Sequence, residues 1–332
     1  MPVISKIIPP FIEYLEIFIQ NEFPNKYNYS NWRQKYDLID ILLDIFNVLE
    51  GNGKWSKYVS SYGIPYKTLH THHVFLSKNN IYEKAYTALL NKYFEKYKYD
   101  KLKYQSIDTQ RGPKAPRLTS FGNVNIALNG TNKAMQSIAE RSETHEVGCD
   151  TTFFQNQYGV EGIGRNKFYH NKKGTKLSTI VDINGITIAA LLVSGNMNDS
   201  ITVDETLDNL LIETKTVEYK EFNKYRQYFL ADKGYDTKHI RNIVTEKGYT
   251  PIIDHNNRNT KDIAKIKKLN EQEKPIYNKR VIVEQSYSWL KKNTRLECRR
   301  EKKLSMFSGF IFLAFIKRLS SFASTHFINL FV

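Results

Sequence analysis

The architecture of this 332-residue chain is most readily predicted from one stretch, Tyr277-Asn-Lys-Arg-Val-Ile-Val-Glu-Gln-Ser-Tyr-Ser-Trp-Leu-Lys291. Apolar and aromatic side chains recur there every three or four residues, which predicts one helix. Arg280, Glu284 and Tyr287 project to the same side of that helix as the two end residues, so an acid lies between two cations. A surface helix with ion pairs also gives Arg-x-x-x-Glu, but the aromatic and apolar neighbours argue against full solvent exposure.

Two aspartates upstream lie in or directly after a predicted strand. Asp150 lies between Glu-Val-Gly-Cys and Thr-Thr-Phe-Phe-Gln-Asn, and Asp232 follows Tyr-Phe-Leu-Ala and begins Asp-Lys-Gly-Tyr-Asp. A strand can deliver each carboxylate, and Gly234 permits a tight turn after the second. Taken singly, each aspartate is equally typical of a turn or a helix cap. With Glu284 they form a set of three acids, as metal-assisted phosphoryl transfer requires.

These motifs together resemble the DDE transposases of insertion-sequence elements. The helix has the spacing Tyr-x2-Arg-x3-Glu-x6-Lys, and the second motif is similar to Ala-Asp-x-Gly-Tyr-Asp in that family. The resemblance implies a ribonuclease-H-like catalytic domain. It also implies that Asp150, Asp232 and Glu284 are the catalytic residues and hold two ions of Mg²⁺ or Mn²⁺.

The same resemblance implies contacts with DNA. The family carries a basic Lys-Gly-x-Lys segment before its second strand and a late basic patch, and both have counterparts here. The residues expected to contact DNA are Tyr277, Arg280, Lys291, Lys172, Lys173, Lys176 and Arg299.

A second aspartate competes with Asp150 for the role of first acid. Gln105-Ser-Ile-Asp-Thr109 also resembles the first catalytic strand, which makes Asp108 a candidate. We prefer Asp150, because the residues after it continue the pattern whereas Asp108 runs into Gly112-Pro113. Residues 111–144 have no strong period and are expected to be an insertion.

Composition supports a polyanionic partner. Lys and Arg number 49 against 34 Asp and Glu, a formal net charge of +15, although AT-rich coding also produces Lys-rich chains. Two cysteines are too few for a disulfide framework and lack zinc spacing, which fits a reducing compartment. The apolar segment from Phe307 is interrupted at Lys317-Arg318, which favours a buried helix over a membrane span.

The pattern divides the chain into a helical DNA-binding domain at 1–104, a linker or insertion at 105–146 and a catalytic domain at 147–332. The first part contains predicted helices at 36–49, 55–62, from Pro65, and at 81–97. Short helices joined by a Gly turn suit a helix-turn-helix or an ordinary small bundle. The histidines of Leu69-His-Thr-His-His73 suggest DNA-facing or exposed residues more than zinc ligands, since no cysteine or acid accompanies them.

The last part has the pattern of a mixed α/β sheet flanked by helices. Asn184-Gly185 joins two β-branched runs and predicts a hairpin between strands at 177–183 and 186–193. Other strands are expected at 147–154, 228–231 and 249–253, the last weakened by Pro251. Helices are expected after a cap at Asp199 or Ser200 and at 237–247.

The resemblance implies a transposase that binds element ends, cleaves DNA and joins it to a target. Its partners would be double-stranded DNA and a second copy of the chain, with no membrane. It would be cytoplasmic and DNA-associated, or located in the nucleus or a viral factory in a eukaryotic or viral setting. A nuclease of the same fold, or a catalytically decayed DNA-binding descendant, are the alternatives.

Overall fold

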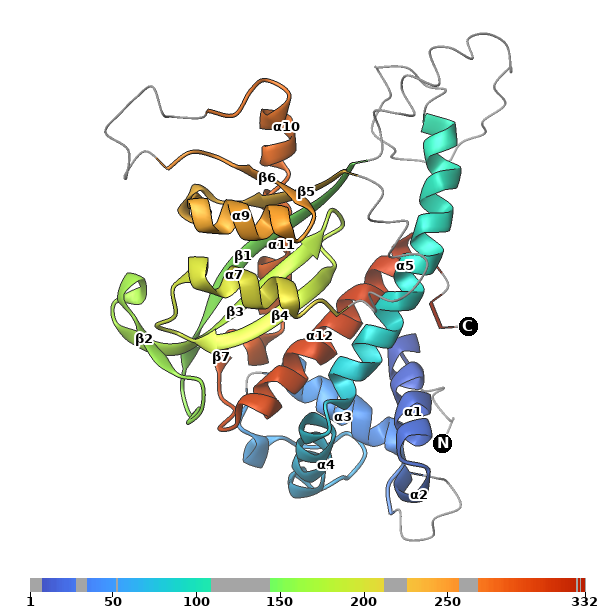
Figure 1. Cartoon of the computed structure of the whole chain (residues 1–332). Coiled ribbons are helices and arrows are strands. Elements are labelled where there is room, and N and C mark those ends of the chain that lie inside the picture. Colours follow the sequence, from blue (N-terminus) through green and yellow to red (C-terminus); the bar gives the residue numbers. More distant parts are fainter. Residues whose placement is uncertain are drawn as a thin grey trace.

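The computed structural model describes residues 8–27, 35–51, 53–108, 144–211, 226–256, 268–326, 328 and 330–331. A mixed sheet with helices on both faces forms one part, and a bundle of helices lies beside it (Figure 1). The chain therefore has the predicted α/β part preceded by an all-α part.

The sheet has the strand order β2-β3-β1-β5-β6, with β4 paired to β3 and β7 to β1. The central strand β1 runs antiparallel to β3 and parallel to β5. The seven strands of the described residues are β1 (Thr144–Asn156), β2 (Gly164–Asn166), β3 (Lys172–Asp182), β4 (Thr187–Ser194), β5 (Arg226–Ala231), β6 (Tyr249–Ile253) and β7 (Cys298–Arg299).

The predicted β3–β4 hairpin is confirmed. Its turn contains Gly185 at φ +72°, a left-handed conformation that glycine adopts without steric cost. Pro251 lies in β6 at the edge of the sheet, where its missing N–H removes no bond to a further strand.

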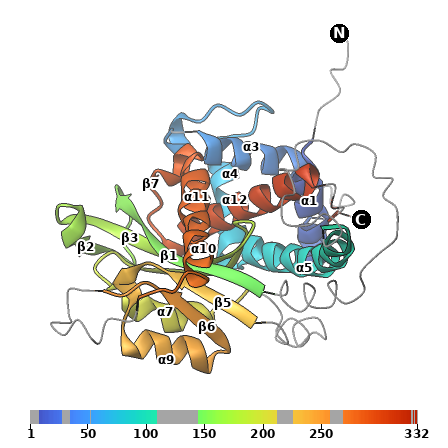
Figure 2. The same ribbon diagram turned by 90° about the horizontal axis from the view of Figure 1, so that it is seen from above.

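Helices α7 (Asp199–Asp208) and α9 (Lys238–Glu246) cover one face of the sheet, and α11 (Val281–Lys291) covers the other (Figure 2). Val203 of α7 and Val244 of α9 pack in one core with Val147 and Phe229 of the strands. The cap of α7 is Asn198, whose Oδ1 accepts from the Ser200 N–H, and not Asp199 or Ser200 as expected.

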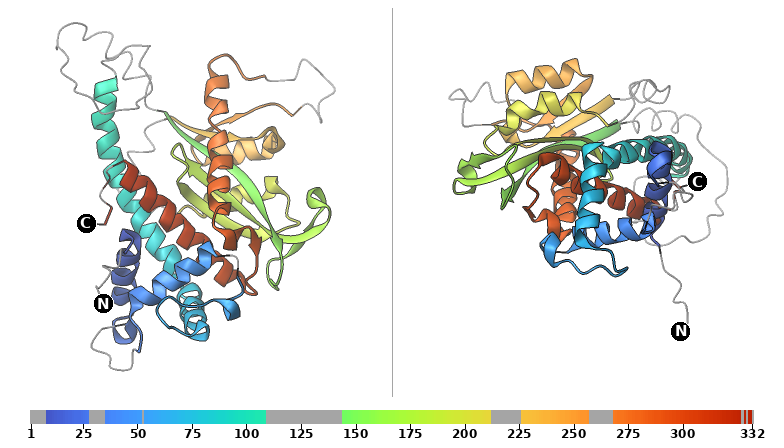
Figure 3. Two further views of the ribbon diagram at one scale, coloured as in Figure 1. Left: turned by 180° about the vertical axis from the view of Figure 1, so that it is seen from behind. Right: turned by 90° about the horizontal axis from the view of Figure 1, so that it is seen from below.

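The helical bundle contains segments from opposite ends of the chain. Its centre is α12, most of whose side chains are buried (Figure 3). By length and composition α12 could cross a membrane, but 78% of its apolar window is buried inside the protein, as predicted for a core helix. The helices are α1 (Pro10–Glu22), α2 (Pro24–Tyr27), α3 (Leu38–Glu50), α4 (Tyr66–Lys78), α5 (Ile81–Asp108) and α12 (Leu304–Thr325).

The predicted helix at 55–62 is wrong. Only one 3₁₀ turn, η1 (Trp55–Lys57), forms there. Its continuation is held irregular by the fully buried Asp44 of α3, whose carboxylate accepts from the Tyr58 hydroxyl at 2.7 Å and from the Ser60 hydroxyl. A buried carboxylate requires such donors, and they outweigh the local helical pattern.

The predicted strand around Gln105 is also wrong. Helix α5 continues through this segment to Asp108. No Gly or Pro interrupts residues 81–108, and Lys, Leu and Gln there favour a helix. The expected insertion at 111–144 lies outside the described residues apart from Thr144, which begins β1.

The single helix expected at 277–291 is divided into α10 (Glu273–Asn278) and α11. At the junction, the backbone N–H groups of Lys279, Arg280, Ile282 and Val283 each bond to the carbonyl three residues back rather than four. These three-residue bonds interrupt the α-helical pattern and separate the two helices.

Candidate active site

Two of the three predicted acids lie side by side on paired parallel strands. In the pairing of β1 with β5, the last matched pair is Cys149 with Ala231. Asp150 is the next residue within β1, which continues to Asn156, and Asp232 is the first residue after β5. Since the hydrogen bonds of a parallel pair are evenly spaced, the two aspartates lie at the same level along the sheet.

The third acid lies on α11, which packs against β1. The Tyr287 hydroxyl donates to the Asp150 carbonyl oxygen at 2.5 Å and accepts from the Thr179 hydroxyl at 2.8 Å. Glu284 lies three residues before Tyr287 and therefore on the same side of α11. A buried tyrosine thus fixes the helix that carries Glu284 to the strand that carries Asp150.

The Asp150 carboxyl group is largely buried, and burial is the main reason that its pKa is raised to about 6. The charges of Asp199 and Glu284 raise the pKa further, while the Thr151 N–H and the Tyr235 hydroxyl, which donates at 3.3 Å, lower it. Asp150 therefore lies within electrostatic reach of Glu284. When the Asp150 carboxyl group is ionised, the nearby groups do not fully offset its loss of hydration.

Arg280 connects the other two acids. Its Nη1 donates to Glu284 Oε1 at 2.9 Å, and the negative charge of Asp232 raises the pKa of the same guanidinium. The Arg280 guanidinium also lies 5.3 Å from the centroid of the Tyr277 ring. Within the described parts of the chain, no three acidic, histidine or cysteine side chains converge closely enough to hold one ion, and Glu284 is paired with Arg280.

The structure distributes the predicted DNA-contacting residues between the surface and the interior. Lys172 and Lys173 are exposed at the start of β3. Lys291 is partly buried beside the Phe154 ring, and burial lowers the pKa of its ammonium group. These three cations remain available on or near the surface.

Lys176 and Arg299 are placed differently from expectation. Lys176 is buried, and its Nζ donates to the Met197 carbonyl at 2.8 Å and to Asp199 Oδ1 at 2.6 Å. Arg299 is fully buried, and its guanidinium donates to backbone carbonyls and, at 2.7 Å, to the Thr175 hydroxyl. The protein itself binds both cations, so neither presents its charge to DNA in this structure.

Asp108 ends helix α5 and lies on no strand, whereas Asp150 lies on β1 beside β5. Two polar groups near Asp150 were not foreseen, Tyr235 and Asp199. Tyr235 belongs to the Asp-Lys-Gly-Tyr-Asp motif, so the motif could have identified it. Asp199 ends Asn196-Met-Asn-Asp199, which resembles a family segment after the third strand, but its place near Asp150 depends on the packing of α7 against the sheet.

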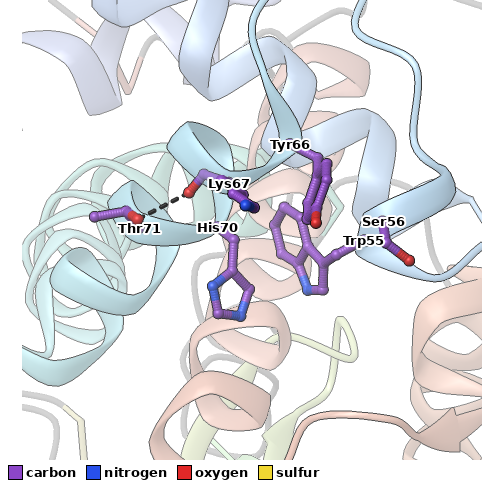
Figure 4. Close-up of a pocket in the computed structure, with 6 residues that line it drawn as sticks. All are labelled: Trp55, Ser56, Tyr66, Lys67, His70 and Thr71. Carbon is purple, nitrogen blue, oxygen red and sulfur yellow. Dashed lines mark hydrogen bonds between the residues drawn. The ribbon is translucent and has the colours of Figure 1, made fainter.

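A pocket of about 480 Å³ lies in the helical part, on none of the elements that carry the three acids (Figure 4). The Thr71 hydroxyl donates to the Lys67 carbonyl at 2.8 Å along its wall. Burial lowers the pKa of His70, which lines the pocket, and His73 lies in the core with its ring stacked 4.0 Å from Phe310. The lining residues are Trp55, Ser56, Tyr66, Lys67, His70 and Thr71.

Known proteins resemble the part of the chain that carries the sheet. The family model described as the transposase DDE domain matches residues 142–318, more than half of the chain. The chain belongs to the DDE transposase family. A Burkholderia cepacia protein named "Putative transposase for insertion sequence element IS402" is 25% identical over 155 residues, 47% of this chain and 67% of that protein. The match to the DDE transposase family includes all of β1, β5 and α11, and so each of the three acids.

The substitution Asp150→Asn is expected to raise the free energy of unfolding of the metal-free protein at pH 7.5 by about 1–3 kcal/mol. The pKa of Asp150 is higher in the folded chain than the ~3.9 of an unfolded aspartate, so ionisation disfavours folding. The extra stability of Asp150→Asn over the parent should therefore be fully present above pH ~6 and absent below pH ~4. Urea unfolding in chelator at pH 4 and 7.5 measures it.

The matched control is Asp204→Asn, because Asp204 is exposed on α7. It should change the free energy of unfolding by less than ~0.5 kcal/mol at both pH values. An Asp150→Asn variant that is no more stable than the parent at pH 7.5 would contradict the buried-charge account.

Proposed function

We propose that this chain is a transposase that binds the ends of a mobile element, cleaves DNA there and transfers the strand to target DNA. The observation that carries the proposal is the position of Asp150 on β1 beside Asp232, the first residue after the parallel strand β5, with Glu284 on the helix that Tyr287 bonds to Asp150. Three carboxylates on neighbouring elements suit metal-assisted phosphoryl transfer.

The donor set fits Mg²⁺ or Mn²⁺. Carboxylate oxygens are the hard ligands that these ions prefer, and Asp150 lies near the negative charges of Asp199 and Glu284, which a bound cation would offset. Glu284 has a half-exposed side chain, so it can rotate from Arg280 toward the aspartates without disturbing the core. Two bound ions would activate the attacking oxygen and stabilise the leaving oxygen.

The other residues of the site have roles that this chain can perform itself. Arg280 would exchange Glu284 for a DNA phosphate, since a guanidinium binds both groups through paired N–H donors. Lys172, Lys173 and Lys291 would hold further phosphates. Tyr277, whose ring lies against Arg280, would orient that guanidinium.

The sheet order and the helices on both faces support a ribonuclease-H-like catalytic fold. A net charge of +15 supports double-stranded DNA as the partner, and the pocket between η1 and α4 adds aromatic rings and a lysine suited to DNA contact. A homodimer on DNA, the absence of membrane association and a DNA-associated location stay predictions.

Strand cleavage is expected to require Mg²⁺ or Mn²⁺ and to stop in excess chelator. Ca²⁺ should support DNA binding but not cleavage, because its larger and more flexible coordination does not fix the attacking oxygen. The assay is cleavage of labelled duplexes that carry the inverted repeats flanking the coding sequence, with a scrambled duplex as control.

Full activity in excess chelator would overturn the metal-dependent account. Cleavage without joining to a second duplex would indicate a nuclease instead of a transposase. Binding of ends without cleavage under any divalent ion would indicate the decayed DNA-binding descendant.

A further inference from the structure

The β2–β3 hairpin projects from the edge of the sheet on the side away from the helical bundle (Figure 1). A 3₁₀ turn, η2 (Lys167–Tyr169), forms its tip. The Asn166 side chain caps this turn by accepting from the Phe168 N–H at 2.9 Å. His170 and Asn171 follow in left-handed conformations, at φ 51° and 55°, and Arg165 Nη1 donates to the Asn171 carbonyl at 3.3 Å. The tip therefore has a defined shape.

Two neighbouring aromatic residues at the tip differ in their contacts, although both are exposed, Tyr169 at 49%. The Tyr169 ring stacks on Phe153 of β1 with centroids 4.7 Å apart and planes at 20°. Gly174 makes room for this stack, because a Cβ there would lie 2.3 Å from the Phe153 ring. Phe168, by contrast, is 92% exposed, the highest value among the exposed large hydrophobic residues. Tyr169 thus anchors a hairpin that presents Phe168 to solvent.

The charged residues of the hairpin have one sign. Between Gly162 and Val181 the sequence has no acidic residue. Single exposed apolar side chains are common on proteins, but an exposed aromatic ring on a hairpin whose charged residues are all basic matches DNA, whose phosphates flank stacked bases. The exposed cations of the hairpin are Arg165, Lys167, Lys172 and Lys173.

The hairpin also lies at a useful distance from the three acids. Phe153 is three residues along β1 from Asp150, about 10 Å at the rise of a strand. The Tyr169 ring stacks on Phe153 with centroids 4.7 Å apart. The side chains of Asp150 and Phe153 point to opposite faces of the sheet, because faces alternate along a strand, so these lengths give only the scale of the separation, a few base-pair steps of ~3.4 Å.

We propose that this hairpin is a DNA wedge: its cations hold phosphates of the element end while the Phe168 ring inserts at a base step a few base pairs from the cleaved bond. Apolar side chains that enter a base step unstack it and bend the duplex. This inference rests on the proposed transposase function and adds a residue that sets where the duplex is distorted.

The test uses the full chain and end duplexes that carry a single 2-aminopurine at successive positions, in Ca²⁺ so that no strand is cut. When the protein binds, the fluorescence of 2-aminopurine should rise severalfold in the duplex that carries it at the wedged base step. Phe168→Ala should abolish the rise and weaken end binding about tenfold, with an unchanged salt dependence. Phe168→Leu should keep most of the rise, because leucine also wedges base steps. Ile17→Ala, which removes another exposed apolar side chain, is the control and should match the parent.

Phe168 is too exposed for these changes to alter folding, so equal melting temperatures are expected for all variants. If the parent cleaves ends but Phe168→Ala gives the same fluorescence profile, or no position responds, the wedge is overturned while the transposase function stands. If the parent neither binds nor cleaves ends, both fail.

Discussion

Replacing Asp232 by Asn is expected to lower DNA-strand cleavage at least a thousandfold, about 4 kcal/mol of transition-state stabilisation, while leaving binding of element ends intact. Asparagine keeps the size of the side chain but removes the charge that attracts two divalent cations. Asp150→Asn and Glu284→Gln should have the same effect. Single-turnover cleavage in Mg²⁺ and fluorescence anisotropy of labelled ends measure the two properties separately.

Asp108→Asn is the matched control, because Asp108 ends a helix and does not lie beside β5. It should retain most of the cleavage rate. Loss of cleavage in Asp108→Asn together with an active Asp150→Asn would show that the first acid was wrongly chosen. Cleavage by all four variants would place the active site elsewhere.

Phe310→Ala is expected to lower the free energy of unfolding by about 3–5 kcal/mol. Phe310 is fully buried in the first half of α12, where its ring stacks on His73 and lies near Trp55. The substitution leaves a cavity between helices from both ends of the chain. Urea unfolding followed by far-ultraviolet circular dichroism measures the loss.

Ile17→Ala on α1 serves as the control, since Ile17 is 58% exposed and should cost less than ~0.5 kcal/mol. A fragment of residues 1–104 tests the same packing between the N-terminal helices and α12, because it contains His73 but not Phe310. Because it lacks α12, which completes its core, the fragment should not unfold cooperatively. A cooperative transition in this fragment would instead restore the independent helical domain that the sequence suggested.

Most of the α/β part could be predicted from sequence because its signals are local. The turn at Asn184-Gly185, the aspartates in β1 and directly after β5 and the stripe of α11 depend on a few consecutive residues. Local sequence patterns gave a wrong prediction where a residue outside the pattern determined the backbone conformation. Asp44, buried in α3, holds residues 58–60 out of a helix through hydrogen bonds that no nearby pattern reveals.

The candidate site was predictable in its acids and less so in its cations. Lysine and arginine side chains are long, and sequence does not tell whether they reach DNA or a partner in the protein. Lys176 and Arg299 found intramolecular acceptors, whereas Lys172 and Lys173, four and three residues before Lys176, remained exposed. Tertiary packing of α7 and β7 made that difference.

Because α12 lies at the centre of the helical bundle, the core of the bundle cannot be completed until the end of the chain has been synthesised. The ring of His73 bonds to the carbonyl of Met306, 233 residues later in the chain. At about 5–20 residues per second, a ribosome needs roughly 10–50 seconds to make the intervening segment. During that time the apolar surfaces of α1, α3, α4 and α5 that pack against α12 stay exposed. The nascent chain should therefore bind chaperones until α12 emerges from the ribosome.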